Sequence, residues 1–415
     1  MSRAHRVVVT GMGVVSPCGN GVEAFWSNVA GGISGIGPIT RFDAGDLPSR
    51  IAGEVRGFDP LDVLSRGKAR RTDRVAQFAL AAAVEAVAQS HLPRGAEHPL
   101  ERIGVLIGTG IGGFESTEEQ IARAAMGGAR RISPYMLPRI LPNMPGAEVA
   151  IEFAYGGPNF CVVSACATAN NCIGESMRMI QSGRADAMVC GATEAPLTPA
   201  FVGGFCAMRA LSVRNDEPPR ACRPFDAGRD GFVIAEGAGV LVLESLDHAH
   251  ARGAEPLAEL CGYATNCDAY HITAMRPGAE RMTAVIRAAL DDAGLAPEAL
   301  DYINAHGTST AQNDAAETAA IHAALGAAAR SVSISSTKSC TGHLLGASGA
   351  VEAIATVMAL RTGCIPPTIN YEHPDPQCDL DYTPNRSRSR KAVTGLSSSF
   401  GFGGHNACLV FRRIE

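Results

Sequence analysis

A cysteine at the expected start of a helix is the strongest candidate nucleophile in this sequence. Cys166 lies in NFCVVSACATANNCIGESMRMIQSG, where a strand predicted over 159–165 leads through small residues into a helix predicted over 169–183. The positive end of the helix dipole and the free N–H groups of the first turn would lower the pKa of the thiol and hold an oxyanion. A buried, inert cysteine is the competing interpretation, because most free cysteines are packing residues.

Two histidines favour the interpretation of Cys166 as a nucleophile. His306 lies in NAHGTST, directly after the strand-like residues DYI, and His343 lies in STKSCTGHLLGASGA. A histidine among Gly, Ser and Thr turns is less often a core residue than one on an apolar helix face. Two such histidines beside strand ends, together with a candidate thiolate, predict an active site.

Three further candidate residues lie in turns of small side chains. Lys338 precedes His343 by five residues, and its simplest interpretation is an ion pair, for which Glu317 is the candidate partner. Phe400 and Phe402 lie in the glycine-rich segment SSSFGFGGHNACLVF. The glycines indicate either backbone that approaches a site or a plain hairpin.

The segment GTGIGG over 108–113 matches the G-x-G-x-x-G fingerprint of dinucleotide-binding proteins, between a predicted strand and a predicted helix. That fingerprint needs a second strand that ends in an acidic residue about 20 residues further on. The chain continues instead as the proline-rich ARRISPYMLPRILPNMP. We therefore interpret the glycines as close backbone packing beside a site and expect no nucleotide cofactor.

The composition excludes several classes of protein. The chain has 415 residues, of which 46% are hydrophobic and 19% charged, as is ordinary for a globular protein of one to three domains. The formal charge of −5 gives no global bias toward nucleic acid or anionic lipid. The apolar runs fall short of the roughly 18–20 residues that a membrane helix needs. We expect neither a nucleic-acid partner nor a membrane span.

Thirteen cysteines indicate a reducing compartment. Their number is odd, and the sequence contains no Cys-x-x-Cys pair. A disulfide framework needs an even set, and a structural zinc site usually needs such pairs. We therefore expect reduced thiols, a cytoplasmic location and no bound metal.

Short β-branched runs alternate with alanine-rich stretches, which predicts an α/β fold. Besides 159–165, strands are expected over 6–15, 102–110, 187–194 and 239–246. Besides 169–183, helices are expected over 74–90 and 282–294.

The sequence also contains a faint internal repeat. Two pairs of segments share an order of elements: 102–113 with 300–310, and 162–183 with 334–363. A duplication would bring the matching turns face to face. We therefore expect two halves, with Cys166 in residues 1–255 and both histidines in residues 256–415.

The motifs together resemble those of the β-ketoacyl-acyl carrier protein synthases, most closely the synthase II group of bacterial type II fatty acid synthesis. In the family's order, the sequence contains VVVTGMGVVSPCGN, ACAT around Cys166, ALSVRND, RPFDAGRDGFVIAEGAGVLVLE, NAHGTST, STKSCTGHLLGASGAVEA, PPTIN and GFGG. The resemblance implies a thiolase-like fold, which is a five-layer αβαβα sandwich of two similar halves that meet at a Cys–His–His site. It also implies a homodimer as the usual assembly.

The resemblance implies an activity and a role for each site residue. Cys166 would take an acyl chain from an acyl carrier protein thioester. His306 and His343 would bind the malonyl thioester carbonyl and assist decarboxylation, and the carbanion would attack the acyl-cysteine. The N–H groups of Cys166 and Phe402 would form the oxyanion hole. Phe402, with Phe400 beside it, would act as a gate, and the chemistry requires no metal or redox cofactor.

Two further roles follow from the same resemblance. Lys338, with Glu317, would hold the charge network around His343. Ile111 would line the acyl pocket across the dimer, where its β-branched side chain would limit the length of the acyl chain.

An acidic acyl carrier protein is the implied partner, and it would dock on basic residues. Arg209 lies in MRALSV, where the family docks its carrier. Lys68, Arg70 and Arg71 form a basic cluster ahead of the expected helix over 74–90. A solvated helix start is the alternative interpretation of that cluster.

Departures from the family pattern leave the substrate open. Asn170 and Asn171 make the segment after the nucleophile more polar, His405 stands where many bacterial members have Thr, and SSSF replaces a common Ser-Asn-Ser-Phe. Fatty acid elongation and a type II polyketide or specialised lipid pathway both remain open, the latter with an identical or a non-identical partner subunit. A non-catalytic chain-length subunit is disfavoured by the presence of Cys166, His306 and His343, and a degradative thiolase by the Cys–His–His order.

Overall fold

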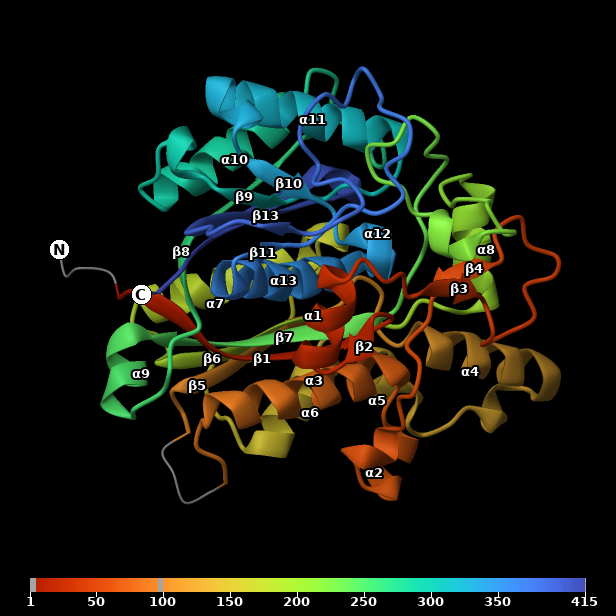
Figure 1. Ribbon diagram of the computed structural model, residues 1–415. Helices are drawn as coiled ribbons and strands as arrows, with labels where there is room; N and C mark the ends of the chain where they lie inside the picture. The colour runs from red at the N-terminus through yellow and green to blue at the C-terminus, as the bar shows by residue number, and fades with distance from the viewer. Residues whose placement is uncertain (1–4, 96–99, 415) are drawn as a thin grey trace.

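Two sheets and three layers of helices alternate in the computed structural model, which describes residues 5–95 and 100–414 (Figure 1). In that view α3 and α6 cover the first sheet from below, α7 and α13 fill the middle, and α10 and α11 cover the second sheet. The bounds are α3 Arg74–Ser90, α6 Met144–Phe153, α7 Thr168–Gln181, α13 Ser348–Thr362, α10 Glu280–Asp292 and α11 Ala311–Leu325. The predicted five-layer α/β sandwich is confirmed.

The first sheet consists of buried apolar strands in the order β5–β6–β7–β1. Their bounds are β5 Ile103–Gly108, β6 Ala187–Glu194, β7 Gly237–Ser245 and β1 Val7–Ser16. β5 and β6 are parallel, whereas β6, β7 and β1 are successively antiparallel. Helices cover both faces of this sheet, so its strands are continuous apolar runs, and all four were predicted from the sequence.

The second sheet repeats this pattern in the order β10–β9–β13–β14–β8. Its strands are β10 Ser333–Ser335, β9 Tyr302–Asn304, β13 Thr394–Gly401, β14 His405–Arg412 and β8 Ala258–Cys267. β9 and β13 are parallel, and β13, β14 and β8 are successively antiparallel. The prediction of two similar halves is therefore confirmed.

The two sheets join where β8 pairs with β1, with Val7 opposite Leu260. The predicted division after residue 255 falls between α9 (Leu246–Ala251) and β8. As a domain boundary it stays a prediction, because the hydrogen-bonded sheet continues through the junction.

The strand predicted over 159–165 is wrong. Only Asn159 forms a bridge, to Val105 of β5, and residues 161–164 are irregular. The segment lies outside β5 at the sheet edge, where the described residues provide no further strand, and Phe160 and Val163 are 42% and 52% exposed. In the second half, β10 occupies the corresponding place beside β9 and does form a parallel strand.

Both central helices begin with the same kind of turn. The 3-10 turn η3 (Ala165–Ala167) precedes α7, and η7 (Leu345–Ala347) precedes α13. The first residue of each turn has a φ of 50°, in the left-handed region that L-residues rarely adopt. The two turns pack against each other, so the duplication places Cys166 beside the segment that follows His343.

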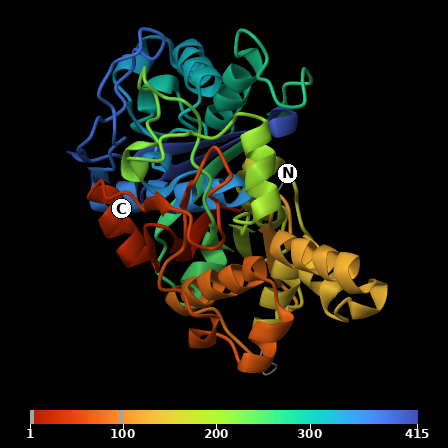
Figure 2. The same ribbon diagram turned by 90° about the vertical axis from the view of Figure 1, so that its right-hand side faces the viewer.

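The remaining elements surround this sandwich. Figure 2 shows α8 on one side of the molecule, with α4 projecting below it. The other helices are α1 Val22–Ala30, α2 Arg66–Arg71, α4 Phe114–Gly127, α5 Met136–Ile140, α8 Pro199–Ala207 and α12 Lys338–Thr341. The other strands are β2 Gly19–Asn20, β3 Ile36–Pro38, β4 Ile51–Gly53, β11 Cys364–Ile365 and β12 Arg388–Ser389. Across the described residues, no helix has both the length and the apolar character to cross a membrane.

Candidate active site

A strained turn presents Cys166 at the start of α7. The preceding residue, Ala165, has a φ of 50°, a conformation that costs an L-residue roughly 1–2 kcal/mol. Thr168 Oγ1 accepts the N–H of Ser164 at 2.9 Å and fixes the turn. Gly401 lies opposite, where a Cβ would come within 3.0 Å of the Cys166 nitrogen. Strain of this kind persists where the surrounding structure holds it, and it is concentrated at functional sites.

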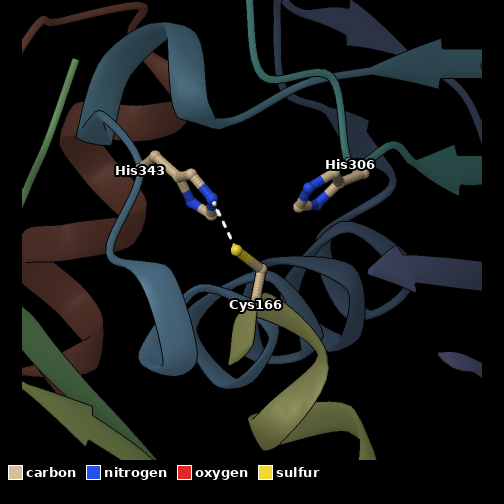
Figure 3. A group of neighbouring side chains, drawn as sticks. All are labelled: Cys166, His306 and His343. Atoms are coloured by element: carbon tan, nitrogen blue, oxygen red, sulfur yellow. Dashed lines mark hydrogen bonds between the residues drawn. The ribbon is translucent and has the colours of Figure 1, made fainter. Parts of the chain in front are cut away.

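His343 and His306 lie on either side of the Cys166 thiol (Figure 3). His343 Nε2 is 3.2 Å from Cys166 Sγ. The sulfur and one nitrogen of each histidine all lie within 4.8 Å of one another. The two imidazole rings stand at 84°, with their centroids 5.4 Å apart. The structure therefore brings together, from three different turns, the three residues that the sequence singled out.

The two imidazoles are neutral near pH 7. Burial lowers the pKa of His306 and of His343 well below the usual value, and the charge of Lys338 lowers both further. Lys338 Nζ lies 3.3 Å from His306 Nδ1, and an ammonium can only donate, so the proton of His306 is on Nε2. His343 Nδ1 lies 2.9 Å from Ser348 Oγ, a hydroxyl that can donate or accept. His306 is therefore fixed as an N–H donor, whereas His343 can exchange a proton at Nε2.

Lys338 pairs with Glu352, so the predicted pair with Glu317 is wrong. Its Nζ donates to Glu352 Oε1, and both side chains are buried. Its hydrogen bond to an imidazole is to His306, so the charge network predicted around His343 is centred on the other histidine. Sequence reasoning missed Glu352, although a single acid within the apolar VEAIATVMAL was a signal.

Glu317 holds the main chain at His306. Its carboxylate accepts the N–H groups of His306 at 2.8 Å and of Gly307 at 2.7 Å, and the hydroxyl of Ser398 at 2.8 Å. Burial raises its pKa to about 7. Glu317 thus positions the His306 imidazole through the backbone.

The thiol of Cys166 is protonated in the free site. Burial raises its pKa to about 12, and the Lys338 cation and the Phe402 N–H, which donates to Sγ, offset only part of this rise. The prediction of a lowered pKa at the helix N-terminus is therefore wrong for this state. His343 is close enough to take the thiol proton, so the geometry allows a neighbouring base to activate the thiol.

The two predicted phenylalanines occupy different places at the site. Phe400 is buried, and its ring centroid is 5.8 Å from that of His306 in an edge-to-face contact. Phe402 is 38% exposed and lines the cavity beside Cys166, and its ring centroid lies 6.4 Å from that of Phe205.

A cavity of about 600 Å³ contains Cys166 and both histidines. An aromatic series forms one wall, with ring centroids 5.3 Å apart for Phe201 and Phe205, 5.2 Å for Phe205 and Phe232, and 5.3 Å for Phe232 and His343. Ile111 lines the same cavity. Sequence reasoning missed the three aromatic residues, because Phe201 and Phe205 lie on α8 whereas Phe232 lies outside it, and only tertiary packing brings them together. Such a wall suits an apolar chain.

The predicted basic residues occupy two separate places. Arg209 is exposed and lines the cavity. Lys68, Arg70 and Arg71 lie on α2 and do not line the cavity. Lys68 Nζ forms ion pairs with two carboxylates of α6, Glu148 at 3.4 Å and Glu152 at 2.6 Å, which compensate its charge.

Cys166, His306 and His343 have the donor atoms of a metal site, but their surroundings do not suit a resident metal. His306 Nε2 carries its proton while Nδ1 accepts from Lys338, so Nε2 has no free lone pair. The Lys338 ammonium also opposes a second cation at this place. The arrangement suits proton transfer and oxyanion binding.

Comparison with known proteins assigns both halves to one family. Residues 4–249 match the model described as Beta-ketoacyl synthase, N-terminal domain, and residues 257–372 match Beta-ketoacyl synthase, C-terminal domain. A protein named 3-oxoacyl-[acyl-carrier-protein] synthase 2 from Synechocystis is 51% identical over 410 residues, which cover 99% of this chain and 98% of the relative.

Two solved structures are similar over the whole chain. A ketosynthase bound to a hexaketide, in complex with its type II PKS acyl carrier protein, has a TM-score of 0.92 and 39% identity, covering 99% of this chain and 100% of its own. The ishigamide ketosynthase/chain length factor has a TM-score of 0.93 and 36% identity, with the same coverage.

Proposed function

This chain belongs to the β-ketoacyl synthase family of carbon–carbon bond-forming acyltransferases, and from that premise we propose that it condenses malonyl-acyl carrier protein with an acyl chain held on Cys166. The observation that carries the proposal is a single thiol between two neutral imidazoles in an apolar cavity. One imidazole can move the thiol proton, and both can donate N–H to a developing oxyanion.

In the first step, the Cys166 sulfur attacks the thioester of an acyl carrier protein. His343 takes the thiol proton at Nε2, which lies 3.2 Å from Sγ, while the new S–C bond forms. The bond between the acyl carbon and the carrier sulfur then breaks, and the proton passes from His343 to the departing carrier thiolate. The imidazole is thereby neutral again for the second half-reaction, and the acyl chain lies in the cavity beside Ile111.

In the second step, the carbonyl oxygen of the malonyl thioester accepts N–H bonds from Nε2 of His306 and of His343. Cleavage of the bond to the carboxylate releases CO₂ and leaves its electron pair in an enolate. The negative charge of the enolate develops on the oxygen that the two donors face. The two hydrogen bonds therefore stabilise the transition state more than the ground state.

In the third step, the enolate carbon attacks the acyl carbonyl on Cys166 and forms the new carbon–carbon bond. The resulting oxyanion lies against the N–H groups of Cys166 and Phe402, the second of which already donates to Sγ in the free site. Collapse of this intermediate breaks the S–C bond, releases a β-ketoacyl carrier protein two carbons longer, and leaves a Cys166 thiolate, which takes up one proton from solvent to return to the thiol.

A reconstitution with purified components tests the proposed function. The protein is mixed with a ladder of saturated acyl carrier proteins, then with malonyl carrier protein, and the intact masses of the carriers and the mass of the Cys166 peptide are recorded. We expect acyl mass on the Cys166 peptide and a β-ketoacyl product two carbons longer. Cys166→Ala removes both, and the matched variant Cys161→Ala, at another half-buried cysteine, retains both. Condensation by Cys166→Ala would contradict the proposal.

Elongation of fatty acyl chains is the first candidate pathway, because the 51% identical relative is named as a 3-oxoacyl-[acyl-carrier-protein] synthase. A type II polyketide or specialised lipid pathway is the second, supported by the 39% identical ketosynthase with a bound hexaketide. In the reconstitution, elongation of plain saturated chains favours the first pathway. Acyl transfer to Cys166 without elongation favours the second.

An acyl carrier protein is the macromolecular partner in both pathways, and we propose Arg209, with Lys68, Arg70 and Arg71, as its docking residues. We also propose a homodimer, because apolar side chains are exposed on α4, α5 and α6, among them Met126 at 85% and Ile151 at 70%. A non-identical partner is the alternative. All thirteen cysteines are free, which supports a cytoplasmic location.

A further inference from the structure

We propose that Glu194 is a positioning residue that holds the acyl-binding wall at Ile111 in fixed relation to the turn that follows His343. The proposal rests on the proposed function, because it assigns the cavity to the acyl chain. Glu194 ends β6, is fully buried, and lines the same cavity as Cys166.

The carboxylate of Glu194 receives hydrogen bonds from two turns that belong to different halves. Oε1 accepts from the hydroxyl of Thr109 at 2.7 Å and from the N–H of Ile111 at 3.3 Å. Oε2 accepts from the N–H of Gly110 at 2.9 Å and from the N–H of Gly346 at 3.0 Å. All four partners donate, so each oxygen must act only as an acceptor.

This set of donors selects a carboxylate. A glutamine of the same shape would replace one oxygen with an NH₂ group. That group is itself a donor, and it would lie against the two donors that the oxygen now accepts from. At that position at least one backbone N–H would lose its acceptor in a buried place, which is a costly arrangement. Burial raises the pKa of Glu194 to about 7, and its four donors act in the opposite direction.

The turns at Gly110 and Gly346 lie so close together that neither glycine has room for a side chain beside the Glu194 carboxylate. A Cβ on Gly346 would lie 2.6 Å from Glu194 Oε2 and 2.8 Å from the nitrogen of Gly110. A Cβ on Gly110 would lie 2.9 Å from the same oxygen. The GTGIGG turn therefore binds an anion through the N–H groups of Gly110 and Ile111, but the anion is the protein's own Glu194 and not a nucleotide phosphate.

Glu194 is hydrogen-bonded to the acyl-binding wall at Ile111 and to the turn that follows His343. Ile111 faces the cavity, and its N–H is held by the carboxylate. Gly346 lies three residues after His343, in the strained turn η7 whose first residue has a φ of 50°. A shift of the carboxylate would therefore displace the cavity wall and the general base together.

The second half uses a similar device. Glu317 accepts backbone N–H groups of the turn after β9, those of His306 and Gly307. Glu194 does the same for the corresponding turn after β5. The two acids come from different elements, α11 and β6. Each buried carboxylate thus fixes the turn that brings one wall of the site into place.

The test compares Glu194→Gln and Thr109→Val with the wild type across acyl carrier proteins from short to long chains. Thr109 is fully buried and does not line the cavity, so its variant removes one donor to Glu194 without touching substrate. Thr109→Ser restores the hydroxyl. Glu85→Gln is the matched control, because Glu85 also accepts two backbone N–H groups, at 2.7 and 2.9 Å, but belongs to no part of the cavity.

We expect Glu194→Gln to lower kcat/KM about tenfold or more for long chains and only severalfold for short ones, since a misplaced wall affects the substrate that reaches it. Thr109→Val should shift the chain-length profile in the same direction, Thr109→Ser should restore it, and Glu85→Gln should leave it unchanged. An unchanged profile, or an equal loss for every chain length, would overturn the proposal. If Glu194→Gln does not fold, the chain-length profiles of Thr109→Val and Thr109→Ser test the proposal instead. A wild type that fails to condense would refute the proposed function itself, and this inference with it.

Discussion

Replacement of Lys338 by methionine should separate a structural role of this residue from its effect on His306. The Lys338 ammonium contacts two groups in the core, Glu352 Oε1 and His306 Nδ1. Among the described residues, Glu352 Oε2 has no hydrogen-bond partner, so Lys338 is the main compensation for that buried charge. Burial already raises the pKa of Glu352, and Lys338 opposes the rise.

The contacts set the size of the expected effects. Lys338→Met leaves the Glu352 carboxylate buried and unpaired, which should lower the free energy of unfolding by about 3–5 kcal/mol. Lys338→Met with Glu352→Met replaces the whole pair by apolar side chains, and stability should return close to that of the wild type. In both variants His306 is no longer held with its proton on Nε2. Decarboxylation should therefore fall by up to about 10²–10³, the value of one oxyanion donor.

Urea unfolding measures the stability, and intact mass of the malonyl carrier protein, converted to acetyl, measures decarboxylation. Arg102→Met is the matched control: Arg102 also pairs with a carboxylate, that of Asp186, but on the surface, where loss of a pair costs less than about 1 kcal/mol. The reasoning is refuted if the double variant recovers both stability and decarboxylation, because Lys338 would then be a structural residue only.

Three further predictions concern single groups of the site. The pKa of Cys166 is raised to about 12, so thiolate accumulates as pH rises, and alkylation by iodoacetamide should increase about tenfold per pH unit between about pH 7 and 9; a plateau near pH 7 would show a standing thiolate. His306→Ala should slow decarboxylation about 10²–10³, while acylation of Cys166 stays within severalfold of wild type, because His343 is the base; equal losses in both half-reactions would reassign the two histidines. Arg209→Glu should weaken binding of an acidic carrier protein about tenfold and leave the rate with a free acyl thioester unchanged; unaltered carrier binding would remove Arg209 from the docking surface.

The proposed catalytic trio could be singled out from the sequence because each residue lies in a turn with its own local signature. Cys166 stands between β-branched residues and a helix, and His306 and His343 stand among Gly, Ser and Thr. The elements that carry them were also predictable, since strands buried on both faces are continuous apolar runs. The exception, 159–165, has the composition of a strand but lies at a sheet edge, and its neighbours are set by tertiary structure.

The supporting residues could not be assigned, because their partners depend on packing between distant elements. Glu317 and Glu352 are both buried acids, and the sequence does not show which of them pairs with Lys338. The packing of α13 brings Glu352 to Lys338. Glu194 left one signal, an acid at the end of the apolar run AMVCGATE, but its donors come from residues 109–111 and 346. The pKa of Cys166 was predicted in the wrong direction because the helix dipole is a local property, whereas desolvation depends on the whole fold.

The central claim is that an acyl chain passes through Cys166 to a malonyl-derived carbanion, and a two-stage mass measurement tests it most directly. The protein is first loaded with a saturated acyl carrier protein and freed of excess carrier, and the Cys166 peptide is weighed before and after malonyl carrier protein is added. We predict one acyl group on that peptide, which disappears as a β-ketoacyl carrier protein two carbons longer appears in equal amount. An acyl group that stays on Cys166 while product forms, or product without any acyl-Cys166, would contradict the mechanism.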